Sequence, residues 1–144
     1  MIRRATPDDG PEVSRVFVAA RDEMPYLPRI EDQHRPLLGG WFIERAQIWL
    51  AEDDGAVVGF SGIEDEELTH LYVDPAAQNR GVGSELLEHA KTVRPERLEL
   101  WVFQANDGAR RFYERHGFRL VEQTDGSGNM EKEPDARYEW TSAG

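Results

Sequence analysis

Apolar residues recur at two different periods along the chain, and these periods predict strands that alternate with helices. Period-two alternation and β-branched or aromatic runs predict strands at residues 2–5, 47–52, 56–63, 68–74, 98–103, 118–123 and 137–140. Helical spacing predicts helices at residues 6–21, 33–46 and 81–92, and a further one that carries Ala109 to His116 and ends at Gly117. The sequence Asp53-Asp54-Gly55 predicts a hairpin turn between the second and third strands.

The order of these elements predicts an α/β fold. A hairpin followed by strands that alternate with helices gives a mixed sheet with helices on its faces. Glycine and proline fall at the expected turns, and no repeat or linker divides the chain, so we expect one domain over residues 1–144. The final strand, 137–140, is expected at a sheet edge, where it could pair across a homodimer.

Composition narrows the classes of function. The chain is 39% hydrophobic and 31% charged, with no apolar run near the ~20 residues of a membrane span and no signal-like start, so we expect a soluble cytoplasmic protein without a membrane partner. A net charge of -11 disfavours nucleic acid and favours a cationic amine. With no cysteine and four dispersed histidines, neither a thiolate nucleophile nor a metal site is expected.

The segment 78–84, Gln-Asn-Arg-Gly-Val-Gly-Ser, lies between a predicted strand and an amphipathic helix. Free amides and the helix dipole converge there, and glycine lets phosphate oxygens approach the backbone, so the segment predicts an anion site. The chain contains no Walker string, and Leu86 stands where a dinucleotide fingerprint requires its third glycine. Both of these phosphate motifs are therefore disfavoured.

The spacing Gln78-x-x-Gly81-x-Gly83 resembles the acetyl-CoA signature of the GNAT superfamily of N-acetyltransferases. Asn106 and the segment 111–118, Arg-Phe-Tyr-Glu-Arg-His-Gly-Phe, extend the resemblance to residues 48–120. It implies a mixed, mostly antiparallel twisted sheet with helices on both faces and a splayed central strand pair. It also implies an acyltransferase that moves acetyl from acetyl-CoA to a primary amine by direct attack in a ternary complex.

The resemblance also implies roles for individual residues. The predicted cofactor contacts are Leu71, Tyr72, Val73, Gln78, Asn79, Arg80, Gly81, Val82, Gly83, Ser84, Asn106 and Tyr113. Tyr113 would act as the general acid toward the leaving sulfur. Glu67 and His70 are candidate bases, with a water chain as the alternative, and alternation places Leu68, His70 and Tyr72 on one face of their strand.

The acceptor, a small-molecule or peptide amine, is expected between the loop 24–32, the second helix and the loop before the final strand. Polyamines, aminoglycosides, amino acids, protein N-termini and lysines all remain open. Candidate contacts are Tyr26, Trp41, Trp49, Glu131, Glu133 and Asp135. The alternative function is a non-catalytic acyl-CoA-binding or sensing module, which would retain Gly81 and Gly83 without depending on Tyr113.

Overall fold

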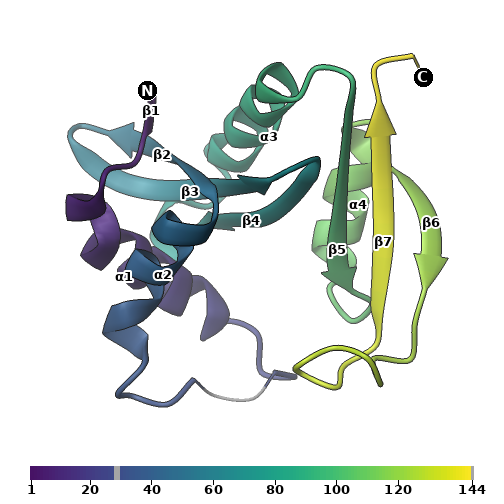
Figure 1. The fold of residues 1–144 in the computed structure, drawn as a ribbon, viewed down its shortest axis with the longest axis horizontal. Helices are drawn as coiled ribbons and strands as arrows, with labels where there is room; N and C mark the ends of the chain where they lie inside the picture. The colour runs from purple at the N-terminus through teal and green to yellow at the C-terminus, as the bar shows by residue number, and fades with distance from the viewer. Residues whose placement is uncertain (28–29, 144) are drawn as a thin grey trace.

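The computed structural model describes residues 1–27 and 30–143, which form a mixed sheet with helices on both faces (Figure 1). The strands are β1 (Ile2–Arg4), β2 (Gln47–Asp53), β3 (Ala56–Glu64), β4 (Glu67–Val73), β5 (Arg97–Phe103), β6 (Arg119–Gln123) and β7 (Asp135–Thr141). The α-helices are α1 (Gly10–Arg21), α2 (Leu38–Arg45), α3 (Val82–Val93) and α4 (Asp107–Arg115), and 3-10 turns lie at η1 (Pro7–Asp9), η2 (Arg35–Leu37) and η3 (Pro75–Ala77). Pro28, in the predicted loop 24–32, lies outside the described residues.

The strand order is β1-β2-β3-β4-β5-β7-β6, and β4 with β5 is the parallel pair within this order. These two strands share one paired position, Glu67 with Glu99, whereas β5 and β7 pair over seven positions from Arg97 to Phe103. The predicted splayed central pair is therefore confirmed. The sheet opens between its β1–β4 half and its β5–β7–β6 half, as Figure 1 shows.

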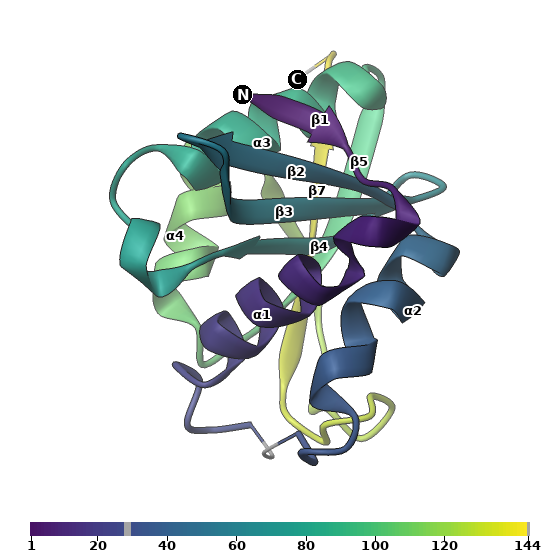
Figure 2. The same cartoon turned by 90° about the vertical axis from the view of Figure 1, so that its left-hand side faces the viewer.

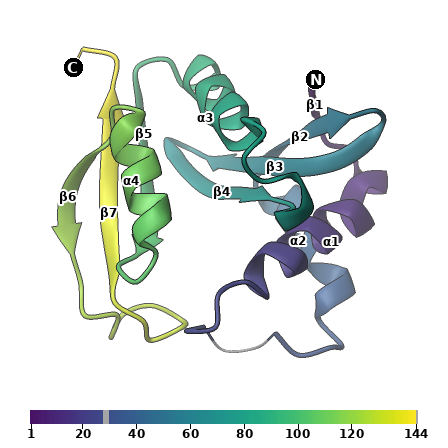
Figure 3. The ribbon, with the colours of Figure 1, turned by 180° about the vertical axis from the view of Figure 1, so that it is seen from behind.

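Two apolar clusters hold the helices against the two sheet faces. Helices α1 and α2 pack on β2–β4 through a cluster that includes Val13, Phe17, Leu50 and Phe60 (Figure 2). Helices α3 and α4 lie on the opposite face, over a second cluster that continues across β5 and β7 through Leu100 (Figure 3). Among residues 1–27 and 30–143, no helix covers the sheet face of β5, β7 and β6 that is turned away from α4 (Figure 1).

The second helix is shorter than predicted, because the chain enters it through η2 and α2 begins only at Leu38. Pro36 fits the first turn of η2, where no amide donor is needed. The helix then passes so close to α1 that a Cβ on Gly39 would stand 2.0 Å from the carbonyl oxygen of Gly10. The amide of Gly39 donates to Oγ of Ser14 at 2.7 Å, which explains glycine in a helix that it otherwise weakens.

The predicted shared face of Leu68, His70 and Tyr72 is wrong, because β4 contains a bulge. Leu68 pairs with Ile63 of β3, but His70 pairs with the adjacent Gly62. The extra residue, Thr69, reverses the alternation. Leu68 therefore joins the core beneath α3, whereas His70 and Tyr72 lie on the face covered by α1 and α2.

The prediction that the final strand lies at an edge is also wrong. Strand β7 is hydrogen-bonded to β5 on one side and to β6 on the other, so β6 is the edge strand. The chain order hides this, because β7 inserts between two strands that precede it. No helix in residues 1–27 and 30–143 is long and apolar enough to cross a membrane.

Candidate active site

A cleft of about 960 Å³ opens between the start of α3, the start of α4 and the free end of β4. Its lining includes most of the residues predicted from the sequence: Leu71, Val73, Gln78, Asn79, Gly81, Val82, Gly83, Ser84, Asn106 and Tyr113. Met24 and Tyr26, from the loop after α1, complete the wall. The structure thus brings the predicted phosphate segment, the splayed strand and the candidate acid into one cavity.

The loop before α3 has the backbone of an anion cradle. Asn79 and Gly81 both have positive φ values, 67° and 82°, and the helix begins directly afterwards at Val82. The first amides of an α-helix have no intrahelical acceptor and carry the positive end of its dipole. The loop therefore presents donors to the cleft without a charged side chain. Arg80 does not line the cleft; its guanidinium stands 3.7 Å from the Asp53 carboxylate, and both groups are exposed.

The opening between β4 and β5 frees one backbone edge. Beyond Glu67 the described part of β4 has no ladder partner on its β5 side, while its other side remains paired with β3 up to Val73. Main-chain donors and acceptors of residues 71–73 are therefore available to an extended ligand. Asn106 stands at the far side of the opening, where its side chain caps α4 by accepting from the Ala109 amide at 3.1 Å.

Tyr113 projects from α4 into the cleft between the rings of Phe112 and Phe118. Burial, and to a smaller degree the nearby Tyr72, raises the pKa of its phenol above the ordinary value. The phenol is therefore protonated at neutral pH. No residue in the described part of the chain hydrogen-bonds to its hydroxyl, so the group is free to donate to a ligand in the cleft.

The two base candidates lie outside the cleft lining. His70 packs against Phe42, with ring centroids 4.2 Å apart, and burial lowers its pKa to about 4. Glu67 lies at the closed end of the β4–β5 opening, where burial and the neighbouring Glu99 and Glu64 raise its pKa. Tyr72 has its ring against Phe17, so a contact with a ligand would come from its backbone.

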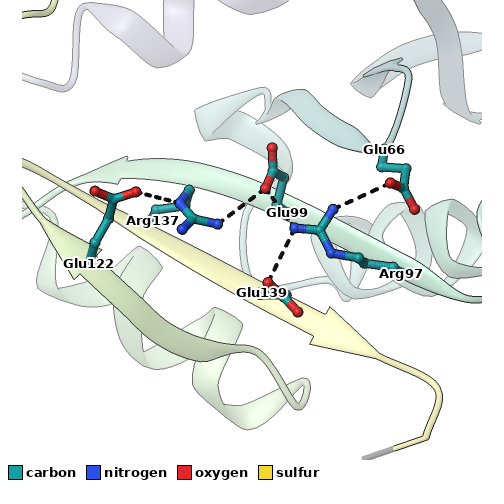
Figure 4. Close-up of polar contacts among 6 residues, drawn as sticks. All are labelled: Glu66, Arg97, Glu99, Glu122, Arg137 and Glu139. Carbon is teal, nitrogen blue, oxygen red and sulfur yellow. Dashed lines mark hydrogen bonds and ion pairs between the residues drawn. The ribbon is translucent and has the colours of Figure 1, made fainter.

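The opposite side of the opening is a charged, uncovered sheet surface (Figure 4). Arg97 contacts Glu99 at 2.8 Å, Glu139 at 3.2 Å and Glu66 at 3.5 Å. Arg137 contacts the same carboxylate of Glu99 at 3.2 Å and that of Glu122 at 2.6 Å. Four carboxylates share two guanidinium groups, so the network is net negative. We call these six residues and Trp101 the open face.

A second cavity, of about 630 Å³, adjoins the open face. Trp101 and Phe103 form its floor from β5, and Glu131 and Asp135 lie in its wall. The indole of Trp101 is 41% exposed, which is unusual for so large an apolar side chain. Tyr26 links the two cavities, because it lines the first and its ring stands 6.1 Å from that of Phe103.

Sequence reasoning missed Trp101 and Phe103, although alternation along β5 gives the signal for both. Leu98, Leu100 and Val102 are buried, so the intervening residues 97, 99, 101 and 103 face the other way. The two tryptophans that were predicted to contact the acceptor lie away from the open face. Trp41 is exposed on α2, and Trp49 packs on His89 and Arg4, outside both cavities.

Comparison with known proteins agrees with the resemblance to the GNAT superfamily that the sequence motifs indicate. The family model described as "Acetyltransferase (GNAT) domain" matches residues 44–120. Peptidyl-lysine N-acetyltransferase YiaC of Escherichia coli is 36% identical over 88 residues, and the match spans 60% of this chain and 60% of that relative's length. Peptidyl-lysine N-acetyltransferase YjaB of Salmonella typhimurium is 33% identical over 122 residues, 83% of each chain.

Solved structures agree over nearly the whole chain. The solution structure of the apo form of YjaB from Escherichia coli superposes with a TM-score of 0.79 at 26% identity, covering 97% of this chain and 96% of that one. PaiA N-acetyltransferase from Thermoplasma acidophilum, solved in complex with coenzyme A, superposes with a TM-score of 0.76 at 21% identity and covers 98% of each chain. The predicted fold class is confirmed.

Proposed function

Because the chain belongs to the GNAT family of acetyltransferases, we propose that it transfers acetyl from acetyl-CoA to the ε-amine of a lysine in a peptide or protein. Two similar proteins are named peptidyl-lysine N-acetyltransferases, and another was solved with coenzyme A. The observation that carries the proposal is the position of Tyr113. Its protonated phenol shares one cleft with a backbone anion cradle and an unpaired strand edge.

The cleft suits a long anionic ligand. Amides of residues 78–84 would bind the pyrophosphate at the start of α3, as helix N-termini do. The unpaired edge of residues 71–73 would bind the amide-containing arm in the manner of an added strand. The arm would then point toward the opening between β4 and β5, where Tyr113 lies on one side and the open face on the other.

Tyr113 would supply the proton that the reaction requires. Attack by the amine nitrogen on the thioester carbonyl forms an N–C bond and breaks the C–S bond, which leaves a thiolate. The Tyr113 hydroxyl would donate to that sulfur as its charge develops. A raised pKa keeps the phenol protonated beforehand, so general-acid assistance is available throughout the neutral range.

The acceptor would approach from the open face. A lysine side chain joins an apolar stem to a cation, which matches Trp101 and Phe103 flanked by Glu131 and Asp135. The negative network of Figure 4 would favour the protonated amine. The amine would lose its proton to a water chain that ends at Glu67, whose raised pKa makes it a better proton acceptor than an ordinary glutamate.

The experiment is an acetylation assay on acceptors of different chemistry. The purified chain is incubated with acetyl-CoA and with a lysine-containing peptide, its N-terminally blocked form, spermidine or an aminoglycoside. Release of free thiol gives the rate, and mass spectrometry locates the acetyl group. We expect one acetyl group on the lysine ε-amine of the blocked peptide. Thiol release with the small amines alone would contradict the peptide substrate, and binding of acetyl-CoA without transfer would favour the non-catalytic module.

A further inference from the structure

Beside the anion cradle, three side chains form a hydrogen-bonded chain that ends at the cleft wall. Oγ of Ser84, which lines the cleft, lies 3.1 Å from Nε2 of His116. Nδ1 of His116 lies 2.9 Å from Oε2 of Glu88. Ser84 and Glu88 are four residues apart in α3 and therefore lie on one helix face, and His116 caps the end of α4 opposite them. The chain joins a cleft hydroxyl to a carboxylate outside.

The carboxylate fixes the tautomer of the histidine. An ionised Glu88 only accepts hydrogen bonds, so Nδ1 of His116 must carry a proton. In the neutral ring Nε2 is then an acceptor, and the Ser84 hydroxyl must donate to it. The hydrogen of Ser84 is thereby turned away from the cleft. Only oxygen lone pairs remain to face an incoming phosphate, and these repel it.

A bound phosphate requires the Ser84 hydroxyl to donate into the cleft and no longer to Nε2 of His116. The Ser84 hydroxyl can donate to a phosphate oxygen only if it releases Nε2, and that half-buried acceptor would then lose its partner. Protonation of the ring removes the conflict, since Nε2–H then donates to Oγ while the hydroxyl donates to the phosphate. The ring would carry one extra proton, taken from solvent, and its charge would be compensated by Glu88 and by the phosphate.

Besides Glu88, two cationic side chains lie near the His116 imidazole and affect a charge on it. Lys91 of α3 contacts the same Glu88 oxygen at 3.0 Å and the His116 carbonyl oxygen at 2.6 Å. Arg115, the preceding residue, lines the cleft, and Phe112 of α4 packs on the ring at 4.7 Å. The two cations oppose a charge on the imidazole, whereas Glu88 and a bound anion favour it. A phosphate bound beside Ser84 would therefore favour the protonated ring over the neutral one.

We propose that Ser84, His116 and Glu88 act as one proton-coupled phosphate-binding unit, in which His116 takes up a proton when Ser84 binds the cofactor pyrophosphate. The inference rests on the proposed function, because it requires coenzyme A in the cradle. His116 is a positioning residue, since it acts on the ligand through Ser84.

Proton-coupled calorimetry tests this unit. Coenzyme A is titrated into the intact chain at pH 7.5 in buffers with different ionisation enthalpies, and the dependence of the observed enthalpy on the buffer gives the protons taken up. His116→Gln places an uncharged amide donor near the position of Nε2. The variant keeps the backbone amides of the cradle and should still bind coenzyme A measurably, and subtraction of its proton count removes protons taken up by the ligand itself.

The unmodified chain should take up more protons than His116→Gln, by up to about one per coenzyme A. Ser84→Ala should lose the same uptake while still binding through backbone amides, which keeps the test decisive if one variant folds poorly. The matched control is His89→Gln on the same helix, because His89 packs on Trp49 outside the cleft. Equal proton counts in the unmodified chain and both variants would overturn the inference. Failure of the unmodified chain to bind coenzyme A would overturn the proposed function as well.

Discussion

The two sides of the β4–β5 opening differ in the chemical groups that line them. The cofactor side consists mainly of backbone amides, small residues and a neutral phenol, and its cradle 78–84 is one continuous segment. The open face consists of carboxylates, guanidinium groups and an exposed indole, supplied by the three strands β5, β6 and β7 and the turn before β4 (Figure 4). The cofactor side fits a ligand that always carries the same phosphate group. The open face fits a cation that is presented by acceptors of different shape.

The difference has a physical origin. A phosphate has a constant shape, so donors fixed by the backbone of one loop recognise it with little dependence on side chains. A lysine acceptor arrives within a larger partner, so side chains that project from a rigid sheet determine what is accepted. We therefore expect changes on the cofactor side to affect either the chemical step or cofactor affinity. Changes on the open face should affect the acceptor alone.

Tyr113→Phe should have the largest effect. Removing the phenolic proton should lower kcat by about 10²- to 10⁴-fold, the range found for general acids, because the thiolate then departs without a donor. The ring and its packing against Phe112 remain, so coenzyme A affinity should be unchanged by calorimetry. An unchanged kcat, measured at saturating acetyl-CoA and peptide, would show that Tyr113 only fills space.

Gly81→Val should come next and should affect cofactor binding. A Cβ at Gly81 meets no atom within 4 Å, so the variant acts through strain at φ 82° rather than by obstruction. Strain of about 1–3 kcal/mol would displace the cradle amides and weaken coenzyme A binding by about 5- to 150-fold. Gly55→Val is the matched control, because Gly55 has φ 79°, equally open surroundings and a place in the β2–β3 turn outside the cleft. Equal loss of affinity in both variants would mean that the cradle has no special role.

Trp101→Ala should produce a smaller change, confined to the acceptor. Loss of an aromatic surface under a lysine stem should raise the KM for the peptide by about tenfold and leave coenzyme A affinity unchanged. Trp41→Ala is the control, because Trp41 is also 41% exposed but lies outside both cavities. Steady-state kinetics at saturating acetyl-CoA separates the two variants. A larger effect from Trp41 would move the acceptor site to α2.

His70→Leu should have the smallest effect on catalysis and should instead change stability in acid. Burial lowers the pKa of His70 to about 4, so between about pH 6.5 and 4 the unfolded chain binds a proton that the folded chain excludes. Stability conferred by the neutral ring is present above pH 6.5 and is lost as the pH falls, by up to about 3 kcal/mol. Urea unfolding at pH 7.5 and 5 should show less acid destabilisation in the variant, with exposed His34→Gln as control. A hundredfold fall in kcat would instead identify His70 as the base.

The sequence predicts the cofactor side better than the open face, because the signals for the cofactor side are local. Loop 78–84 and the α4 segment each lie within a few residues, so their spacing survives in the linear chain. The bulge at Thr69 is set by pairing with β3. No local sequence pattern indicates that this bulge places His70 and Leu68 on opposite faces of the sheet. The insertion of β7 between β5 and β6 likewise depends on tertiary pairing. These two features explain the wrong strand face and the wrong edge.

The open face was missed for a related reason. Glu66, Arg97, Glu122 and Glu139 come from four segments, and only the assembled sheet brings them into one network. Alternation along β5 could have marked Trp101 as facing away from the core. The partnership of Ser84 with His116 spans 32 positions and also required the packed helices.

The most direct test of the cofactor site is calorimetric titration of the chain with acetyl-CoA, and in parallel with coenzyme A, ATP and NADH. We expect saturable binding of acetyl-CoA and coenzyme A at one site per chain, with ATP and NADH at least about tenfold weaker, because only the coenzyme A ligands carry both a pyrophosphate and an extended arm of secondary amides that can pair like a strand. Failure of the coenzyme A ligands to bind, or a preference for ATP or NADH, would contradict the assignment of the cleft.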